Sequence, residues 1–315
     1  MSAQLSPEKL QAHLANGLMG FPFTDFAADG AFLPDPFQAR VADMAQRGCA
    51  AMFVAAGAGE FFSLTTEEYA RLMSAAVAAR TQGVPLLGAA GMGTRDAVAH
   101  ARLVEKSGAD GLLLLPPYLT EVPQAGLAAH IAEICRSTSL GVVVYSRANG
   151  KLKADTLARL AEQCPNLVAL KDGAGDTEEL WAMRLALGDR VAFLNGMPTA
   201  EVYAPSFAGM GVPSYSSAIF SFLPSFALSF FHAVQRGDRR FVDDAMARFI
   251  LPYVRLRMRQ PGYAVSLPKA GVTIVGRSAG PVRPPLVDIS REEYAELEKL
   301  IASAKQLEEA AKLAG

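Results

Sequence analysis

Short runs of apolar residues alternate with longer amphipathic segments along most of the chain. Three of the runs are continuously apolar rather than alternating: Leu112–Leu115, Val142–Tyr145 and the residues leading to Lys171. A strand has such a run when both of its faces are buried, as in a parallel sheet covered by helices. The pattern predicts strands at Gly17–Phe23, Ala51–Ala55, Pro85–Ala90, Gly111–Leu115, Gly141–Tyr145, Leu167–Lys171, Val191–Asn195 and Gly211–Ser214.

Helix-length segments separate these strands, for example Thr65–Thr81, Arg95–Lys106 and Asp155–Gln163. Several helix ends are followed by glycine and then by an apolar run, as at Gly48 and Gly108. This order is typical of a repeated βα unit. Eight such units predict an α/β fold of the (β/α)8 TIM-barrel class. A doubly wound sheet is the alternative, but no GxGxxG sequence follows the first strand.

Both ends of the chain add helices to the predicted barrel. Ser6 and Pro7 have the positions of an N-cap and a first helical residue, so a short N-terminal helix is expected within residues 1–236, the barrel. Residues 237–315 are expected to form a C-terminal helical extension packed on the barrel. It divides into helix-like Arg239–Met258, a Gly/Pro-bearing segment Pro261–Pro285, and Ser290–Leu313, where Ser290 and Glu293 have capping-box spacing.

The stretch from Val202 to Gln235 contains no Asp, Glu, Lys or Arg and has to be tested as a membrane span. Glycine, proline and several serines interrupt it, so the better interpretation is a buried strand followed by a buried helix. We therefore expect no contact with a membrane.

Composition narrows the class of protein further. The chain has 315 residues, 51% of them hydrophobic, and a formal net charge of −1, which excludes a mainly disordered chain and argues against nucleic-acid binding. Cys49, Cys135 and Cys164 are widely spaced, which predicts neither a disulfide framework nor a zinc site and fits a cytoplasmic protein. The histidines fall in helical segments and no carboxylate–histidine cluster appears, so no metal is expected.

Lys171 is the first candidate for chemistry, because it ends the sixth strand and function in a TIM barrel lies at the carboxyl ends of strands. It alone among nine lysines follows three apolar residues in a buried strand. Desolvation lowers the pKa of an ammonium toward the range in which the free amine is a nucleophile, as a Schiff-base lysine requires. A lysine turned toward solvent or paired with Asp172 is the alternative.

Two further features lie at the same predicted barrel edge. Tyr145 ends the fifth strand, next to Lys171, and its phenol can relay protons there; a core tyrosine is the alternative. Gly57, Ala58 and Gly59 follow the second strand, and a turn of small residues exposes backbone N–H groups that suit a carboxylate or a phosphate. A turn needed only for packing explains those residues equally well.

These residues together resemble the dihydrodipicolinate synthase/N-acetylneuraminate lyase family of class I aldolase-type barrels. The resemblance rests on GAGE at Gly57–Glu60, on the strand-ending Tyr145 and on VALKD around Lys171, and it extends over nearly the whole chain. It implies that Lys171 forms a Schiff base with an α-keto acid, that Tyr145 shuttles protons, and that the turn after strand two binds the carboxylate. It also implies no cofactor and a homo-oligomer, either a dimer or a tetramer.

Departures from the family pattern indicate one branch of it. Ala58 stands where the family has a hydroxyl, Ser146 and Ala148 replace the usual asparagine and proline, and no acidic pair follows Gly196 directly. With GEFFSLT, YSRANG and KDGAGD, these departures resemble the 5-dehydro-4-deoxyglucarate dehydratase branch. Its small-molecule substrate is a keto diacid, a sugar acid, so a second anion must be bound. Candidates for binding the substrate are Gly57, Ala58, Gly59, Arg147, Asn195, Gly196 and Ser214.

The activity that this resemblance implies is a dehydration with decarboxylation through a lysine Schiff base, which yields 2,5-dioxopentanoate, water and carbon dioxide. Arg147 is expected to bind the distal carboxylate as a charge-assisted fork, although a surface salt bridge is an equal alternative. Two other functions stay open: a Schiff-base aldolase, lyase or synthase acting on another 2-keto acid, and a non-catalytic barrel that binds keto acids.

Overall fold

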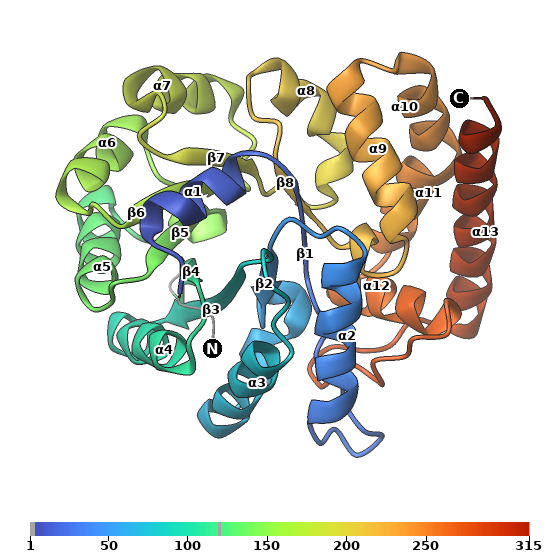
Figure 1. Ribbon diagram of the computed structural model, residues 1–315, viewed down its shortest axis with the longest axis horizontal. Helices are drawn as coiled ribbons and strands as arrows, with labels where there is room; N and C mark the ends of the chain where they lie inside the picture. Colours follow the sequence, from blue (N-terminus) through green and yellow to red (C-terminus); the bar gives the residue numbers. More distant parts are fainter. Residues whose placement is uncertain (1–3, 119–120, 315) are drawn as a thin grey trace.

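Eight parallel strands close into a barrel in the computed structural model of the chain, which describes residues 4–118 and 121–314 (Figure 1). Each strand pairs with the next in sequence, and β1 closes the barrel against β8 through Leu18 and Tyr215. The strands are β1 Leu18–Gly20, β2 Met52–Val54, β3 Leu86–Met92, β4 Gly111–Pro117, β5 Gly141–Ser146, β6 Leu167–Asp172, β7 Ala192–Asn195 and β8 Tyr215–Ser217. The predicted TIM barrel is confirmed.

Helices cover the outside of the barrel between successive strands (Figure 1). They are α2 Pro34–Gln46, α3 Thr66–Ala78, α4 Thr94–Ser107, α5 Gln124–Arg136, α6 Ala154–Gln163, α7 Thr177–Leu187, α8 Ala204–Gly209 and α9 Pro224–Arg236. Single helical turns follow several strands at the carboxyl end of the barrel: η1 Gly57–Gly59, η2 Phe61–Ser63, η3 Ala148–Gly150, η4 Ala200–Val202 and η5 Ile219–Ser221. These turns supply most of the residues discussed below.

The amino end of the barrel is closed by α1 Pro7–Ala15, which crosses it in Figure 1. As predicted, Ser6 caps this helix, and its hydroxyl accepts a hydrogen bond from the Lys9 amide. Leu10 is fully buried there, and a Cβ added at Gly111 or Gly141 would lie 2.4 or 2.9 Å from its Cδ2. The close fit of a leucine against two strand-initial glycines seals this end with apolar atoms.

The eighth strand lies a few residues later than predicted. The sequence pattern placed it at Gly211–Ser214, whereas β8 comprises Tyr215–Ser217. Pro213 explains the difference, because proline has no N–H to donate to a strand ladder. The strand pairing therefore begins after Pro213. Ser214 contributes only its carbonyl, which accepts a hydrogen bond from the backbone N–H of Asn195.

The C-terminal helices gather along one side of the barrel (Figure 1). They are α10 Arg239–Ala245, the π-helical turn η6 Met246–Ile250, α11 Leu251–Arg257, α12 Tyr263–Ile274 and α13 Arg291–Ala314. The capping box before α13 is confirmed, because Ser290 and Glu293 exchange side-chain-to-amide hydrogen bonds. Pro261–Pro285 is more ordered than its glycines and prolines indicated, since it contains α12 with Pro268 inside the helix. The division at residue 236 stays a prediction.

The uncharged stretch Val202–Gln235 contains α8, β8 and α9, and most of its large side chains are buried. The prediction of a buried strand followed by a buried helix is confirmed, with a short helix ahead of it. Across the described ranges, every helix is either too short or too polar to span a bilayer.

Candidate active site

A cavity of about 280 Å³ opens at the carboxyl ends of the strands. Its lining includes Lys171 and Tyr145, which the parallel ladder between β5 and β6 pairs directly in register. The structure thus brings together the two residues singled out from their strand-end positions. The cavity lies where TIM barrels carry their active sites.

The Lys171 side chain is buried, with only 3% of the residue exposed. Its Nζ lies 3.5 Å from the centroid of the Tyr145 ring. Burial lowers the pKa of the Lys171 ammonium, and the positive charge of Arg147 adds to that effect, while Tyr145 opposes it. A neutral amine is therefore more accessible near neutral pH than at an exposed lysine, and a neutral amine is the nucleophile that attacks a ketone.

Tyr145 is held by two hydrogen bonds at its phenol oxygen. The hydroxyl donates to the Gly196 carbonyl at 2.7 Å, and Arg147 Nη1 donates to the same oxygen at 3.1 Å. Burial opposes ionisation of the phenol, but the charges of Lys171 and Arg147 outweigh it and lower the Tyr145 pKa. A phenol of lowered pKa next to the amine suits proton transfer to and from a lysine adduct.

Gly196 borders both groups, and no larger residue fits there. A Cβ at this position would lie 2.6 Å from Lys171 Cγ and 2.9 Å from both Lys171 Nζ and a Tyr145 ring carbon. The glycine predicted as a substrate contact therefore also keeps open the space around the amine.

The turn after β2 forms another part of the wall. Gly57 and Ala58 line the cavity, whereas Gly59 lies behind it, where its carbonyl accepts a hydrogen bond from Thr24 at 2.6 Å. Glu60 follows in the left-handed backbone region, with φ 58°. A non-glycine residue rarely adopts that conformation unless its surroundings hold it there.

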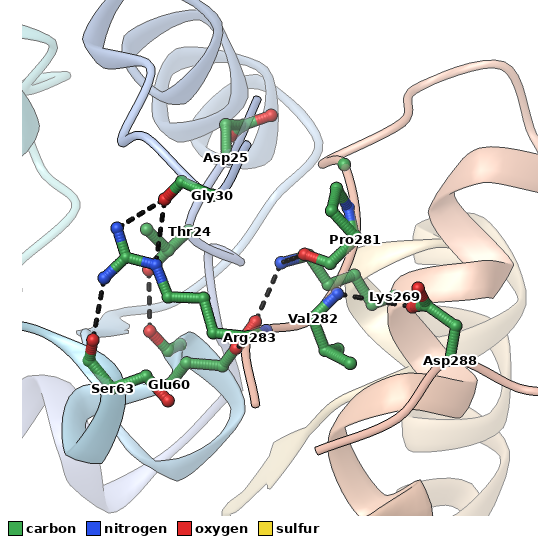
Figure 2. A network of polar contacts seen from close by, with 12 residues as sticks. Thr24, Asp25, Gly30, Glu60, Ser63, Lys269, Pro281, Val282, Arg283 and Asp288 are labelled. Carbon is green, nitrogen blue, oxygen red and sulfur yellow. Dashed lines mark hydrogen bonds and ion pairs between the residues drawn. The ribbon is translucent and has the colours of Figure 1, made fainter. Parts of the chain in front are cut away.

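A buried ion pair supplies that constraint (Figure 2). Glu60 Oε1 accepts a hydrogen bond from Lys269 Nζ at 2.7 Å, and Oε2 accepts one from the Arg283 amide at 2.9 Å. Lys269 also donates to the Pro281 carbonyl at 2.8 Å, and Glu60 and Lys269 are 1% and 2% exposed. The C-terminal extension thereby fixes the turn that borders the cavity. Sequence reasoning missed this second buried lysine, because α12 lay within a segment taken to be irregular.

Besides Gly59, the predicted substrate contacts Asn195 and Ser214 do not line the cavity. The side-chain N–H of Asn195 donates to the Ala200 carbonyl, and Asn195 Oδ1 accepts a hydrogen bond from the backbone N–H of Met197. This fully buried side chain therefore shapes the loop after β7. Ser214 is also fully buried and lies outside the lining. The serine that does line it on this side is Ser216, two residues later, as the displaced eighth strand requires.

Two charged residues of the lining were missed in the sequence, Glu201 and Arg257. Glu201 is 1% exposed, and burial raises its pKa to about 7. A signal for it exists in the sequence, since Glu201 is the single Asp, Glu, Lys or Arg between Arg190 and Arg236. Arg257 comes from α11, which sequence reasoning placed only on the outside of the barrel.

No group of three or more His, Cys, Asp and Glu side chains is placed to hold a metal ion in the part of the chain that the structure describes. The titratable groups that line the cavity are one amine, two phenols, one carboxyl and two guanidinium groups.

A comparison with protein-family models decides the family. The model described as the dihydrodipicolinate synthetase family matches residues 14–304. The chain belongs to the dihydrodipicolinate synthetase family. This match includes the C-terminal helices as well as the barrel, in agreement with the resemblance found in the sequence.

Within this family, similar curated proteins share one name. The chain is 48% identical to a probable 5-dehydro-4-deoxyglucarate dehydratase from Pseudomonas entomophila, over 94% of this chain and 97% of that protein. It is also 48% identical to a protein of the same name from Methylobacterium radiotolerans, over 96% of this chain and 100% of that protein. Dihydrodipicolinate synthase from Oceanobacillus iheyensis has the same fold, with a TM-score of 0.87, 21% identity and coverage of 96% and 100%.

Proposed function

We propose that this protein is a 5-dehydro-4-deoxyglucarate dehydratase that acts through a Schiff base on Lys171. The observation that supports this most directly is the buried Lys171 amine, in register with Tyr145 at the edge of a cavity whose other walls hold polar groups. The name shared by relatives of 48% identity points to the same substrate. A metal-independent class I mechanism needs only the amine and a proton relay.

The proposed reaction begins when the Lys171 amine attacks the ketone. The carbinolamine hydroxyl takes the Tyr145 proton and leaves as water, giving an iminium and a Tyr145 phenolate. The iminium acidifies the neighbouring methylene, and the phenolate accepts the proton from it. The electron pair enters the enamine and then expels the β-hydroxyl. In the conjugated iminium that results, the carbon–carbon bond to the distal carboxylate breaks, carbon dioxide leaves, and the electron pair of that bond flows to the nitrogen. Protonation of carbon and hydrolysis of the iminium release 2,5-dioxopentanoate, and the proton set free by hydrolysis returns to Tyr145.

The walls of the cavity suggest how the diacid is oriented. We assign the keto-acid carboxylate to the turn at Gly57 and Ala58, where backbone groups face the cavity. Arg147 is assigned to the distal carboxylate, because it lines the cavity and its guanidinium is exposed enough to reach a ligand. A partly solvated contact favours decarboxylation, since a deeply buried ion pair would stabilise the carboxylate that must lose its charge.

Product analysis tests this function. With 5-dehydro-4-deoxyglucarate, the purified enzyme is expected to release one carbon dioxide and one 2,5-dioxopentanoate per substrate, without pyruvate. Coupled assays for carbon dioxide and pyruvate, together with mass spectrometry of the product, measure both outcomes. Stoichiometric pyruvate would instead establish an aldolase, and tight binding of keto acids without turnover would establish a non-catalytic barrel.

Arg147→Lys tests the assignment of the distal carboxylate. Lysine keeps the charge but loses the planar fork, so the KM for the diacid is expected to rise by about tenfold, with a smaller change in kcat. Trapping of pyruvate, which has no distal carboxylate, provides the control and should change little. An unchanged KM would move the assignment to Arg257, and Arg257→Lys is the paired variant for that outcome.

A further inference from the structure

Glu201 is an active-site group that the proposed mechanism has not yet used. It lies in η4, in the loop after β7, five residues beyond the Gly196 that borders the Lys171 amine. Among the described residues that line the cavity, it has the only carboxyl group. A carboxyl that is 1% exposed costs free energy unless its surroundings or its protonation compensate for the lost water.

The surroundings of Glu201 compensate only in part. Oε1 accepts a hydrogen bond from the Ser217 hydroxyl of β8, while Oε2 is buried and has no hydrogen-bond partner among the described residues. Arg257 of α11 contributes a positive charge, and its own Nε is likewise buried without a partner. The other titratable groups facing Glu201 are the phenols of Tyr215 and Tyr253, both buried.

This environment raises the protonated fraction of Glu201 near neutral pH. Burial raises the pKa of the carboxyl to about 7, although the Ser217 hydrogen bond and the Arg257 charge act in the opposite direction. In the protonated state the carboxyl can donate a hydrogen bond, and a general acid works best when its pKa is close to the working pH.

The other proton-bearing groups of the lining suit this task less well. The Tyr145 hydroxyl is hydrogen-bonded to Gly196 and Arg147, and Tyr145 already receives the methylene proton in the proposed mechanism. Burial raises the pKa of Tyr253, which makes its phenol a weaker acid than usual. Lys171 is covalently engaged during the reaction. Glu201 is therefore the acid best matched to a leaving hydroxide.

We propose that Glu201 is the general acid that protonates the β-hydroxyl as it leaves the Lys171-bound substrate. This assignment rests on the proposed function. The enamine electron pair breaks the carbon–oxygen bond, the oxygen takes the Glu201 proton, and water departs, which leaves Glu201 as a carboxylate. After carbon dioxide has left, the enol hydroxyl returns a proton to Glu201. Tyr145 gives its proton to one carbon and solvent supplies a proton to the other, so one proton is consumed overall.

The test separates proton transfer at the methylene from loss of the hydroxyl. Pyruvate has no β-hydroxyl, so exchange of its methyl hydrogens with D2O requires Lys171 and Tyr145 but not Glu201. For Glu201→Gln we expect pyruvate exchange within about twofold of wild type and turnover of the diacid lowered roughly 10²–10⁴-fold. Borohydride added to Glu201→Gln during turnover of the diacid should trap an adduct on Lys171 that still contains the β-hydroxyl. Glu298→Gln, on the exposed side of α13, is the matched control and should behave as wild type.

The pH profile gives a second readout that a structural role would not move. The kcat/KM of wild type should fall as pH rises through about 7, because Glu201 loses its proton, and Ser217→Ala should shift that limb to higher pH. Turnover of Glu201→Gln within about threefold of wild type, or an equal loss of pyruvate exchange and turnover, would overturn the proposal. If wild type exchanges pyruvate but leaves the diacid unchanged, the proposed function fails and the role of Glu201 fails with it.

Discussion

Lys171→Ala is expected to lower turnover by about 10⁴-fold or more, the largest effect of any single substitution in this chain. The amine is the only group that can hold the substrate covalently and act as the electron sink in the proposed mechanism. Because the side chain is buried in the floor of a preformed cavity, its removal should leave the barrel folded. Circular dichroism and the melting temperature check that point alongside the activity.

Covalent trapping tests directly whether the Schiff base forms on the Lys171 amine. Borohydride with pyruvate should add the mass of one reduced pyruvate to the wild-type peptide that contains Lys171, and nothing to Lys171→Ala. Lys151→Ala, which removes an exposed lysine, serves as the control and should be labelled like wild type. An adduct on another lysine, or full activity in Lys171→Ala, would refute the Schiff-base mechanism.

The sequence was most informative about site residues that lie at the carboxyl end of a strand. Lys171 and Tyr145 were predicted because a charged or phenolic residue ends a continuous apolar run, and the ladder pairs them as expected. That inference needs only the side-chain pattern of a buried strand and the rule that barrel sites lie at carboxyl ends. The fold followed from the same pattern, since eight apolar runs separated by helices have few other arrangements.

Residues placed by irregular segments were harder to predict. The position of Asn195 at a strand end predicts a substrate contact, yet its side-chain amide is hydrogen-bonded within its own loop, to the Ala200 carbonyl and the Met197 backbone N–H. Arg257 enters the cavity from α11, and no local pattern states which barrel loop a C-terminal helix will contact. Such contacts depend on how distant segments pack, which periodicity does not encode.

Glu60 and Lys269 form the clearest case of this kind. The two residues are separated by 209 positions, so neither sequence neighbourhood predicts that a buried carboxylate and a buried ammonium neutralise each other. Figure 2 shows Lys269 from α12 and Arg283 from the following segment converging on Glu60, directly after the turn that lines the cavity. The ion pair therefore connects the C-terminal extension with the geometry of the site.

Removing one member of this pair is expected to be the most destabilising of the substitutions considered. In Glu60→Gln the Lys269 ammonium stays buried without its counter-charge, and in Lys269→Met the Glu60 carboxylate keeps only the Arg283 amide. Each change should cost about 3–5 kcal/mol, which lowers the melting temperature by roughly 5–8 °C in a chain of this length.

A double-mutant cycle and a surface control make this prediction decisive. The double variant Glu60→Gln/Lys269→Met should lose less stability than the sum of the single variants, because no unpaired buried charge is left. Arg239→Ala breaks the exposed pair with Asp243 and should change the free energy of unfolding by less than about 1 kcal/mol. Since Glu60 fixes the turn at Gly57 and Ala58, both single variants should also need more pyruvate for half-maximal trapping on Lys171. Additive losses would show that the two residues contribute independently and that the pair does not hold the turn.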